Sequence, residues 1–168
     1  MRAAVLVLSG AAITFTATLH DTVFSQVLFA LSVLAVAVAE LTTSLLTRVA
    51  RKVSPLTLIQ ALIAVAAGVV IVLTMDNFAA FTLTVTVWAA LTAVIEVWFA
   101  WKGAATSPAR EVRVIGVFSG LLALLLVIVP SSPTSVIGFY GGYCFVVGVY
   151  LAIAAFDRTA TRVTESEQ

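Results

Sequence analysis

The chain has 168 residues, of which 62% are hydrophobic and only 10% are charged, and its mean hydropathy is +1.17. In soluble globular domains about a quarter of the residues are charged, so this composition excludes an ordinary soluble domain and predicts an integral membrane protein. The formal net charge is +1, and no basic patch is interleaved with aromatic residues. We therefore expect the lipid bilayer, and not a nucleic acid, as the partner.

Six apolar runs follow one another along the chain, at 3–19, 22–46, 55–75, 77–101, 108–129 and 133–156. Each has, or nearly has, the ~20 residues that a transmembrane helix needs. The runs are continuous, whereas a membrane barrel needs short alternating segments. Arg2 and the run after it can imitate a signal peptide, but we interpret 3–19 as a retained first span. The predicted fold class is an all-α membrane protein with six transmembrane helices.

The predicted helices form three consecutive hairpins, at about 3–47, 55–102 and 108–157. Together they make one six-helix domain over 1–157, followed by a polar, frayed tail at 158–168. The junctions carry helix-start residues: Ser-Pro pairs at 54–55, 107–108 and 132–133, and Asp or Asn at 21, 76 and 77. A side-chain oxygen there can accept from a free backbone N–H, and proline suits the first helical position.

The basic residues predict the orientation of these helices. All nine fall on the side of the N-terminus, at Arg2, Arg48, Arg51, Lys52, Lys102, Arg110, Arg113, Arg158 and Arg162. The outer turns near 20, 76 and 132 contain none. The positive-inside rule therefore predicts that both termini are cytoplasmic, and Trp98 and Trp101 precede Lys102 as an aromatic belt would. We expect a multi-pass protein of the bacterial plasma (inner) membrane.

An internal repeat relates the hairpins. Asp21 and Asp76 are 55 residues apart, and Glu40 and Glu96 are 56 apart, within similar strings at 38–41 and 94–97. The same period next reaches Tyr150 and Leu151, so the third copy lacks the acid. A repeat of this length built from two helices indicates stacked hairpins.

The last third of the chain carries a family resemblance. The string GVFSGLLALLLVIVP at 116–130, followed after a turn by FVVGVYLAIAAF at 145–156, resembles the repeat of the HdeD-like bacterial membrane proteins. Residues 1–47 depart from it, because they lack the proline turn and the paired glycines. The resemblance implies an inner-membrane protein of two-helix repeats, commonly with six helices, that is associated with acid resistance. It carries over no catalytic residues.

Glu40 and Glu96 are the sharpest candidate site. An acid within a membrane span costs ~2.5–3.5 kcal/mol on insertion scales and indicates function by default. Both lie near the cytoplasmic helix ends, so they can also extend to the interface or pair with Arg48 and Lys102. If the hairpins pack about a common axis, the two carboxyls meet in one seam, where both cannot easily be ionised. The alternatives are thus a structural role and a proton-binding role.

Glycines and one outer turn supply the other candidates. Gly116 and Gly120 form a GxxxG motif, and the last helix contains Gly138, Gly141, Gly142 and Gly148. Such glycines mark either docking to another chain or internal packing, and we favour packing of the fifth predicted helix on the sixth. His20 beside Asp21 is a candidate outer pH-responsive pair, although a lone histidine in a turn is more commonly only polar.

No motif for catalysis, a metal or a cofactor is present, and the single Cys144 excludes a disulfide within the chain. We expect no enzyme and no cofactor. The first functional interpretation is a non-enzymatic HdeD-like protein acting in envelope or acid stress. The second is an accessory subunit of a larger membrane complex, and the third is a small proton-coupled transporter that uses Glu40 and Glu96. A homo-oligomer or a larger complex is the expected assembly.

Overall fold

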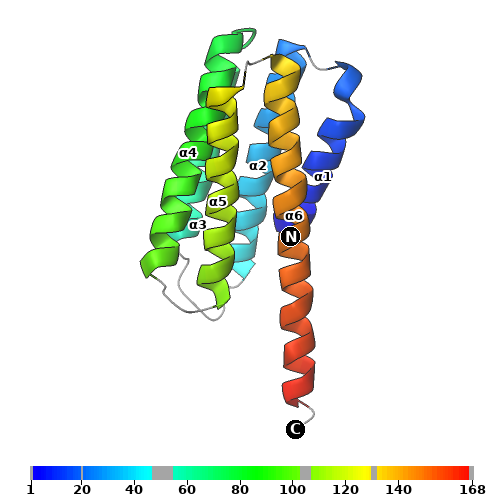
Figure 1. Cartoon of the computed structure of the whole chain (residues 1–168), viewed down its shortest axis with the longest axis vertical. Coiled ribbons are helices and arrows are strands. Elements are labelled where there is room, and N and C mark those ends of the chain that lie inside the picture. The colour runs from blue at the N-terminus through cyan, green and yellow to red at the C-terminus, as the bar shows by residue number, and fades with distance from the viewer. Residues whose placement is uncertain (1, 20, 47–54, 103–106, 130–131, 167–168) are drawn as a thin grey trace.

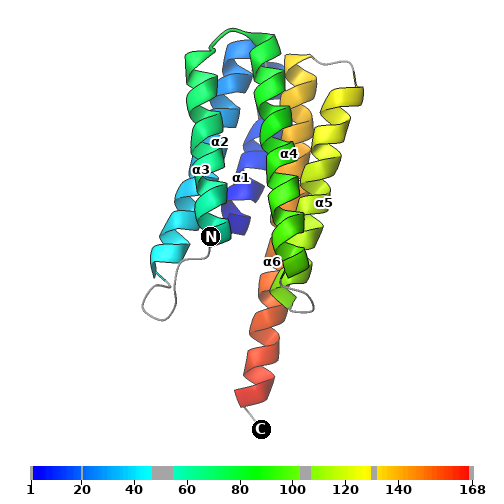
Figure 2. The ribbon, with the colours of Figure 1, turned by 90° about the vertical axis from the view of Figure 1, so that its left-hand side faces the viewer.

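The computed structural model describes residues 2–19, 21–46, 55–102, 107–129 and 132–166, with side chains described over 2–19, 21–43, 55–102, 110–129 and 132–156. Six α-helices account for nearly all of these residues. They are α1 (Arg2–Phe15), α2 (Thr22–Leu46), α3 (Pro55–Leu73), α4 (Phe78–Lys102), α5 (Ser107–Ile128) and α6 (Pro133–Ser166), with a short 3₁₀ helix, η1 (Ala17–Leu19), after α1. The helices run alternately up and down in one bundle (Figures 1 and 2).

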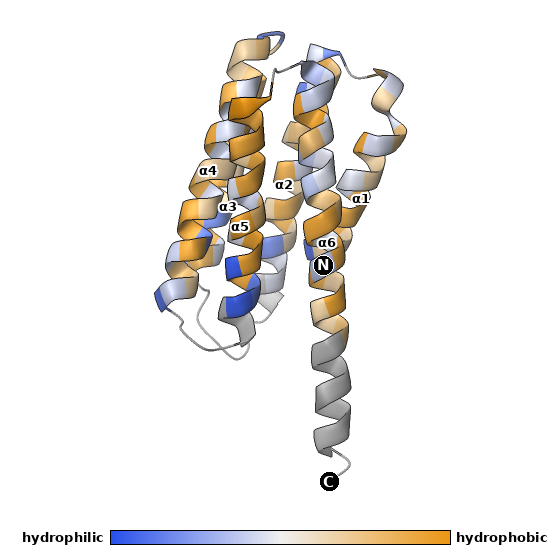
Figure 3. Cartoon of the chain, in the orientation of Figure 1, coloured by the Kyte–Doolittle hydropathy of each residue, from blue (hydrophilic) through white to orange (hydrophobic). Residues whose placement is uncertain are grey.

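Five of the helices, α2 to α6, are long and apolar enough to cross a membrane. Their outward surface is rich in exposed Leu, Val, Ile and Phe, and apolar residues extend along most of each helix (Figure 3). Such a surface is unfavourable in water and suits lipid. The prediction of an all-helical fold is confirmed for the described residues, and five helices suit a multi-pass membrane protein.

The first predicted span differs from the expectation. α1 has 14 residues, which corresponds to ~21 Å, against a hydrocarbon core of ~30 Å. The threonine hydroxyls at its end bond back to the helix, from Thr14 to the Gly10 carbonyl (2.9 Å) and from Thr16 to the Ala12 carbonyl (2.8 Å). The chain continues as a turn and η1, although Thr84 and Thr86 make the same kind of bond inside α4 without ending it. Residues 3–19 are therefore a short helix followed by a turn and η1, and not the single long helix expected.

The outer turns contain the helix caps that the sequence predicts. Asp21 accepts from the backbone N–H of Phe24 (2.7 Å), Asn77 from that of Ala80 (3.0 Å) and Ser132 from that of Ser135 (3.1 Å). Each bond satisfies a free donor in the first turn of α2, α4 or α6. Ser54 lies outside the described residues, and α5 already begins at Ser107.

The three caps set a common register for α2, α4 and α6. Equivalent positions, counted from the cap, are fully buried in all three helices: Phe29, Val85 and Tyr140 at one level, and Val33, Ala89 and Cys144 one turn further on. Glu40 and Glu96 share a deeper level, where α6 has Leu151. A second register relates the buried residues of the other helices, namely Leu6 and Ile13 in α1, Ala64 and Ile71 in α3, and Ser119 and Leu126 in α5.

The closest helix packing occurs between hairpins and not within them. The most extensive contacts join α1 to α6, α2 to α3 and α4 to α5. Small residues explain this choice, because a Cβ added at Gly10 would lie 2.9 Å from the Gly141 carbonyl, and one added at Gly116 would lie 3.0 Å from Val97. The three equivalent interfaces close the bundle into a ring of three repeats.

A buried glutamine fastens α2 to the turn between α3 and α4. The side-chain amide of Gln26 donates to the carbonyls of Thr74 (3.1 Å) and Asn77 (3.4 Å), and its oxygen accepts from the N–H of Asp76 (2.9 Å). Asp76 has a φ of 62°, a left-handed conformation that usually requires glycine or asparagine. The tight turn therefore depends on a residue from another helix.

The C-terminal segment also differs from the expectation. α6 continues to Ser166, beyond the end of the other helices (Figure 1), so most of the polar tail predicted at 158–168 is helical and not frayed. Residues 157–166 contain neither glycine nor proline, and no local signal ends the helix there.

Candidate functional site

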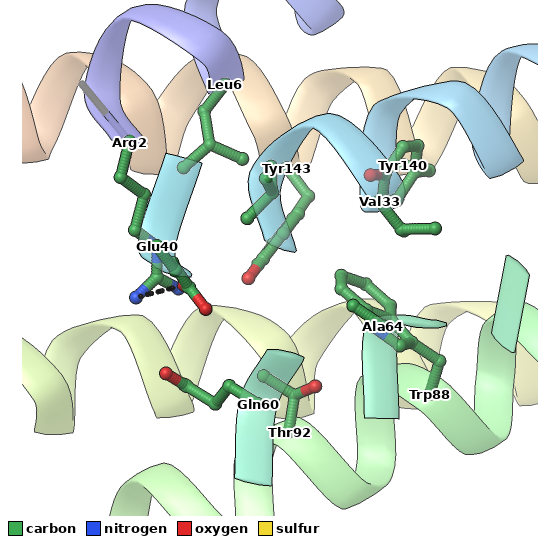
Figure 4. Close-up of a pocket in the computed structure, with 11 residues that line it drawn as sticks. Arg2, Leu6, Val33, Glu40, Gln60, Ala64, Trp88, Thr92, Tyr140 and Tyr143 are labelled. Atoms are coloured by element: carbon green, nitrogen blue, oxygen red, sulfur yellow. Dashed lines mark ion pairs between the residues drawn. The ribbon is translucent and has the colours of Figure 1, made fainter. Parts of the chain in front are cut away.

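Glu40 and Glu96 come together in the interior of the bundle. They lie on α2 and α4 and are 8% and 1% exposed. One guanidinium reaches both, because Arg2 on α1 lies 3.1 Å from a Glu40 oxygen and 3.4 Å from a Glu96 oxygen. Figure 4 shows the pair of Arg2 with Glu40. We call these three residues the ion cluster.

The position of α1 makes this cluster possible. Figures 1 and 2 both place the start of α1 above the lower ends of α4 and α5, and α1 packs on α6 and α2, so that Arg2 reaches the two buried acids. Arg2 is consequently only 27% exposed, and its Nε has no hydrogen-bond partner among the described residues. Arg2 therefore pairs with buried acids inside the bundle, whereas the sequence pattern indicated only that it helps to set the orientation in the membrane.

Glu96 has further partners from two more helices. The side-chain amide of Gln60 on α3 donates to it at 2.7 Å, and the hydroxyl of Ser119 on α5 lies 3.3 Å from its other oxygen. Ser119 is also 3.0 Å from the hydroxyl of Tyr143 on α6. The one hydroxyl proton of Ser119 is shared between Glu96 and the carbonyl of Ile115 (3.0 Å), which both only accept, so Tyr143 is the donor to Ser119. All six helices thus contribute a residue to the cluster or its hydrogen bonds.

A small cavity adjoins the cluster (Figure 4). It has about 30 Å³ of room for the centre of a water molecule, which exceeds the ~10–15 Å³ that one water needs. Its lining is polar at the cluster end and aromatic at the other: Arg2, Leu6, Val33, Val36, Glu40, Gln60, Ala64, Trp88, Thr92, Tyr140 and Tyr143. The cavity has the size and the polar groups to hold water beside the carboxylates.

Aromatic side chains close the site toward the outer turns. Trp88 packs edge-to-face on Tyr140 (5.6 Å between ring centroids) and on Tyr143 (6.0 Å), and Phe29 packs on Tyr140 at 4.8 Å. The polar side chains next to the cavity end in this direction with the hydrogen bond between Ser32 and Tyr140. Above it the centre is filled mainly by fully buried apolar residues, namely Phe81, Val85, Val136 and Ile137, and α2 adds the fully buried Ser25 and Gln26 toward the outer turns. We call these apolar residues the apolar plug.

The repeat explains why the cluster is asymmetric. Counted in the registers described above, Arg2, Gln60 and Ile115 are equivalent positions of the three repeats, as are Glu40, Glu96 and Leu151. At these two levels the first two repeats supply polar or charged side chains, whereas the third supplies the aliphatic Ile115 and Leu151. Ile115 is buried, so the third side of the cluster is packed with hydrocarbon and adds no charge.

The basic partner of Glu40 and Glu96 is not one of those that the sequence suggested. Pairing with Arg48 or Lys102 was one expectation, but the described ion pairs of Glu40 and Glu96 are both with Arg2. Lys102 lies instead over the ring of Trp98, 4.9 Å from its centroid. Arg48 lies outside the described residues. The spacing of the acids predicted that they share a seam, but nothing in the spacing indicated the cation between them.

The glycines divide into two groups. A Cβ at Gly116 or Gly120 would meet α4, at Val97 and Ala93, and not α6, so the expected packing of the fifth helix on the sixth is wrong in its partner. Gly141 and Gly148 face Ile13 and Val7 of α1. Gly138 and Gly142 have no atom within 4 Å of an added Cβ and face outward.

In the outer turn, Asp21 has a structural task as the cap of α2. His20 lies outside the described residues. Sequence reasoning missed Gln60, Ser119 and Tyr143, which are ordinary residues of apolar helices. Aligning the odd-numbered helices would have been the one available signal, because it places Gln60 at the level of Arg2.

Comparisons of the chain with protein-family models, with curated proteins and with solved structures find no match. The resemblance of 116–130 and 145–156 to HdeD-like proteins therefore stays a prediction. Any functional assignment depends on the geometry of the ion cluster and its surroundings.

Proposed function

We propose that this chain is a non-enzymatic, multi-pass protein of the bacterial inner membrane whose ion cluster takes up and releases a proton. We further propose that it acts in the acid or envelope stress with which HdeD-like proteins are associated. The observation that carries the proposal is the sharing of one guanidinium, that of Arg2, by two buried carboxyls, Glu40 and Glu96.

Charge balance is the physical basis. One guanidinium and two ionised carboxylates leave the cluster with an excess negative charge, and the surrounding helices supply no second cation among the described residues. An uncompensated charge in a low-dielectric interior is unfavourable. A proton is the smallest species that removes it, and Glu96 already accepts hydrogen bonds from Gln60 and Ser119 that can readjust around it.

The surroundings favour a responsive site over a continuous pathway. The hydrogen bonds around the cluster reach Tyr143 and Tyr140, and the large side chains of the apolar plug then separate them from Gln26 at the outer turn. A transporter that uses Glu40 and Glu96 would have to open this plug in each cycle. A site that binds a proton from one side needs no such opening, so we place the transporter last.

Trp88 offers a direct test, because it lines the cavity and packs on Tyr140 and Tyr143. In a Trp98→Phe, Trp101→Phe background it is the only tryptophan. We expect its fluorescence to change with pH through one transition in reconstituted protein, and we expect Glu40→Gln and Glu96→Gln each to remove or displace that transition. Asp21→Asn is the matched control, since Asp21 is an exposed acid whose capping role asparagine can keep.

A transition that survives in both glutamine variants would contradict proton binding by the cluster. The cellular part is tested separately, by survival of a deletion strain in acid after complementation. Glu40→Gln and Glu96→Gln should fail to complement at unchanged amounts in the membrane, whereas Asp21→Asn should complement. Fluorescence titration without a survival defect would retain the proton site and reject the stress role.

The second candidate, an accessory subunit, is favoured by one observation on α6. Gly138 and Gly142 are exposed one turn apart with open space above them. Small residues at this spacing allow another membrane helix to approach closely. The paired substitution Gly138→Leu, Gly142→Leu should abolish a complex seen by native mass spectrometry while the thermal transition of the monomer stays unchanged. An unaltered complex would exclude this face as the docking site.

A further inference from the structure

We propose that the groove between α4 and α5 binds an anionic phospholipid, with one acyl chain in the groove and the headgroup at its basic end. This site is independent of the ion cluster and of the proposed proton uptake. Its chemistry is that of a lipid with a negative headgroup, such as phosphatidylglycerol.

The groove is apolar and lies on the outer surface of the bundle. It has a volume of about 460 Å³ and is lined by Ala93, Val94, Val97, Trp98, Trp101, Gly116, Val117 and Gly120. Its floor exists because α5 has glycines where α4 approaches, so the two helices touch without filling the space beside them. α4 and α5 run side by side in both Figure 1 and Figure 2. No lining residue carries a charge, which suits a hydrocarbon chain.

Basic residues gather at one end of the groove. Lys102 lies over the ring of Trp98, which itself lines the groove. On α5, Arg110 and Arg113 precede Gly116 and Val117 at helical spacing and therefore share their face. Glu111 falls on the opposite face of α5, at the same end of the helix. Figure 3 shows the hydrophilic turns of α4 and α5 at the same end of the bundle.

This combination selects a lipid over a second protein chain. Basic side chains beside an apolar groove between membrane helices match an anionic headgroup with its acyl chain. Exposed Trp98 and Trp101 mark the depth at which headgroups meet hydrocarbon. A second groove, between α3 and α4, has a volume of about 310 Å³ and is also lined by uncharged residues, among them Leu83 and Val87. It is a natural control, because the nearest described basic residue on these two helices, Lys102, comes 11 residues after its lining residue Leu91.

The two groove tryptophans report on occupancy. In a Trp88→Phe background, protein is reconstituted in phosphatidylcholine vesicles that contain a minority of brominated phosphatidylglycerol or of brominated phosphatidylcholine, and quenching is compared at equal mole fractions. We expect stronger quenching by the brominated phosphatidylglycerol. Arg110→Gln with Arg113→Gln should reduce the preference by about fivefold for each residue, the factor that corresponds to the ~1 kcal/mol of one basic group at a membrane surface.

Filling the groove separates a built site from general attraction to a basic surface. Val117→Phe, or Val94→Phe on the opposite wall, adds a ring to an exposed lining residue and should abolish the preference. Leu83→Phe, in the control groove, should leave it unchanged. Equal quenching by the two brominated lipids in the unsubstituted groove would overturn the proposal. So would a preference that survives both groove-filling substitutions.

Discussion

At the residue scale, Arg2 has the largest consequence for stability, because two buried acids depend on it. Replacing one member of a buried ion pair leaves the partner charged in a low-dielectric interior, which typically costs ~3–5 kcal/mol. Since Arg2 is 27% exposed, we expect Arg2→Gln to lower the free energy of unfolding by about 3 kcal/mol, near the lower end of that range. Thermal unfolding in a mild detergent measures the change.

The control for Arg2 is a charge-matched double variant. Adding Glu96→Gln to Arg2→Gln removes one of the two carboxylates left without a cation, so the double variant should be more stable than Arg2→Gln alone. A double-mutant cycle gives the coupling free energy directly. Additive losses from the two substitutions would contradict the ion pair between Arg2 and Glu96.

Gln26 allows a second prediction at this scale. Gln26→Leu introduces an apolar side chain of similar size and removes three hydrogen bonds to the turn at 74–77. The N–H of Asp76, in an exposed turn, is then left without its protein partner, and the loss of a typical hydrogen bond costs ~0.5–1.5 kcal/mol. We expect a loss of about 1 kcal/mol in the free energy of unfolding. Gln26→Glu keeps the acceptor for Asp76 but turns a buried carboxylate toward the carbonyls of Thr74 and Asn77, so it should destabilise the protein more than Gln26→Leu.

At the element scale, apolar length and capping residues predicted where α2, α4 and α6 begin, because Asp21, Asn77 and Ser132 act locally. The end of α1 at Phe15 was not predictable from hydropathy, because the apolar run continues to Leu19. Which helices pack on each other was even less predictable from the sequence. Gly116 shows why: the residue marks a close approach, but the same glycine would serve a contact with α6 as well as the contact with α4 that forms.

The glycines give a matched pair of substitutions. Gly10→Ala would put a Cβ 2.9 Å from the backbone of α6, which cannot move aside cheaply, so we expect a loss of about 1–3 kcal/mol. Gly142→Ala meets open space and should be neutral or stabilising by up to ~1 kcal/mol, since alanine is the better helix former. The unfolding temperature should therefore fall for Gly10→Ala and should rise or stay unchanged for Gly142→Ala. Equal shifts would contradict the α1–α6 interface.

At the scale of the whole molecule, the class of fold was predictable and the centre was not. Continuous apolar runs led to an all-helical membrane protein, because each run carries its own signal. The ion cluster draws single residues from distant helices, and Arg2 and Glu96 are 94 positions apart. The repeat suggested that Glu40 and Glu96 share a depth. It gave no reason to expect Arg2 beside them, because the equivalents of Arg2 are Gln60 and Ile115.

The orientation in the membrane is a prediction for the whole chain. Cysteines introduced at Leu19, Met75 and Ser131, in or beside the outer turns, should react with a membrane-impermeant thiol reagent in intact cells. Cysteines at Arg51 and Ala105 should react only after the cells are opened. The native Cys144 is fully buried and should contribute no background. Leu19 and Met75 avoid the caps Asp21 and Asn77. Labelling at Arg51 or Ala105 in intact cells would contradict cytoplasmic termini.

The packing of α1 on α6 has a consequence for how the protein is made. α1 leaves the ribosome first, yet Gly10 and Leu6 find their partners in Gly141 and Gly148, near the end of the chain. At ~5–20 residues per second, α1 waits for many seconds before its interface exists. During that time α1 is short, carries Arg2 and lacks its main packing partner α6, so few contacts stabilise it in the bilayer. Biosynthesis therefore ends with the closure of the ring, and a nascent chain truncated before α6 would expose both α1 and Arg2 to the membrane quality-control machinery.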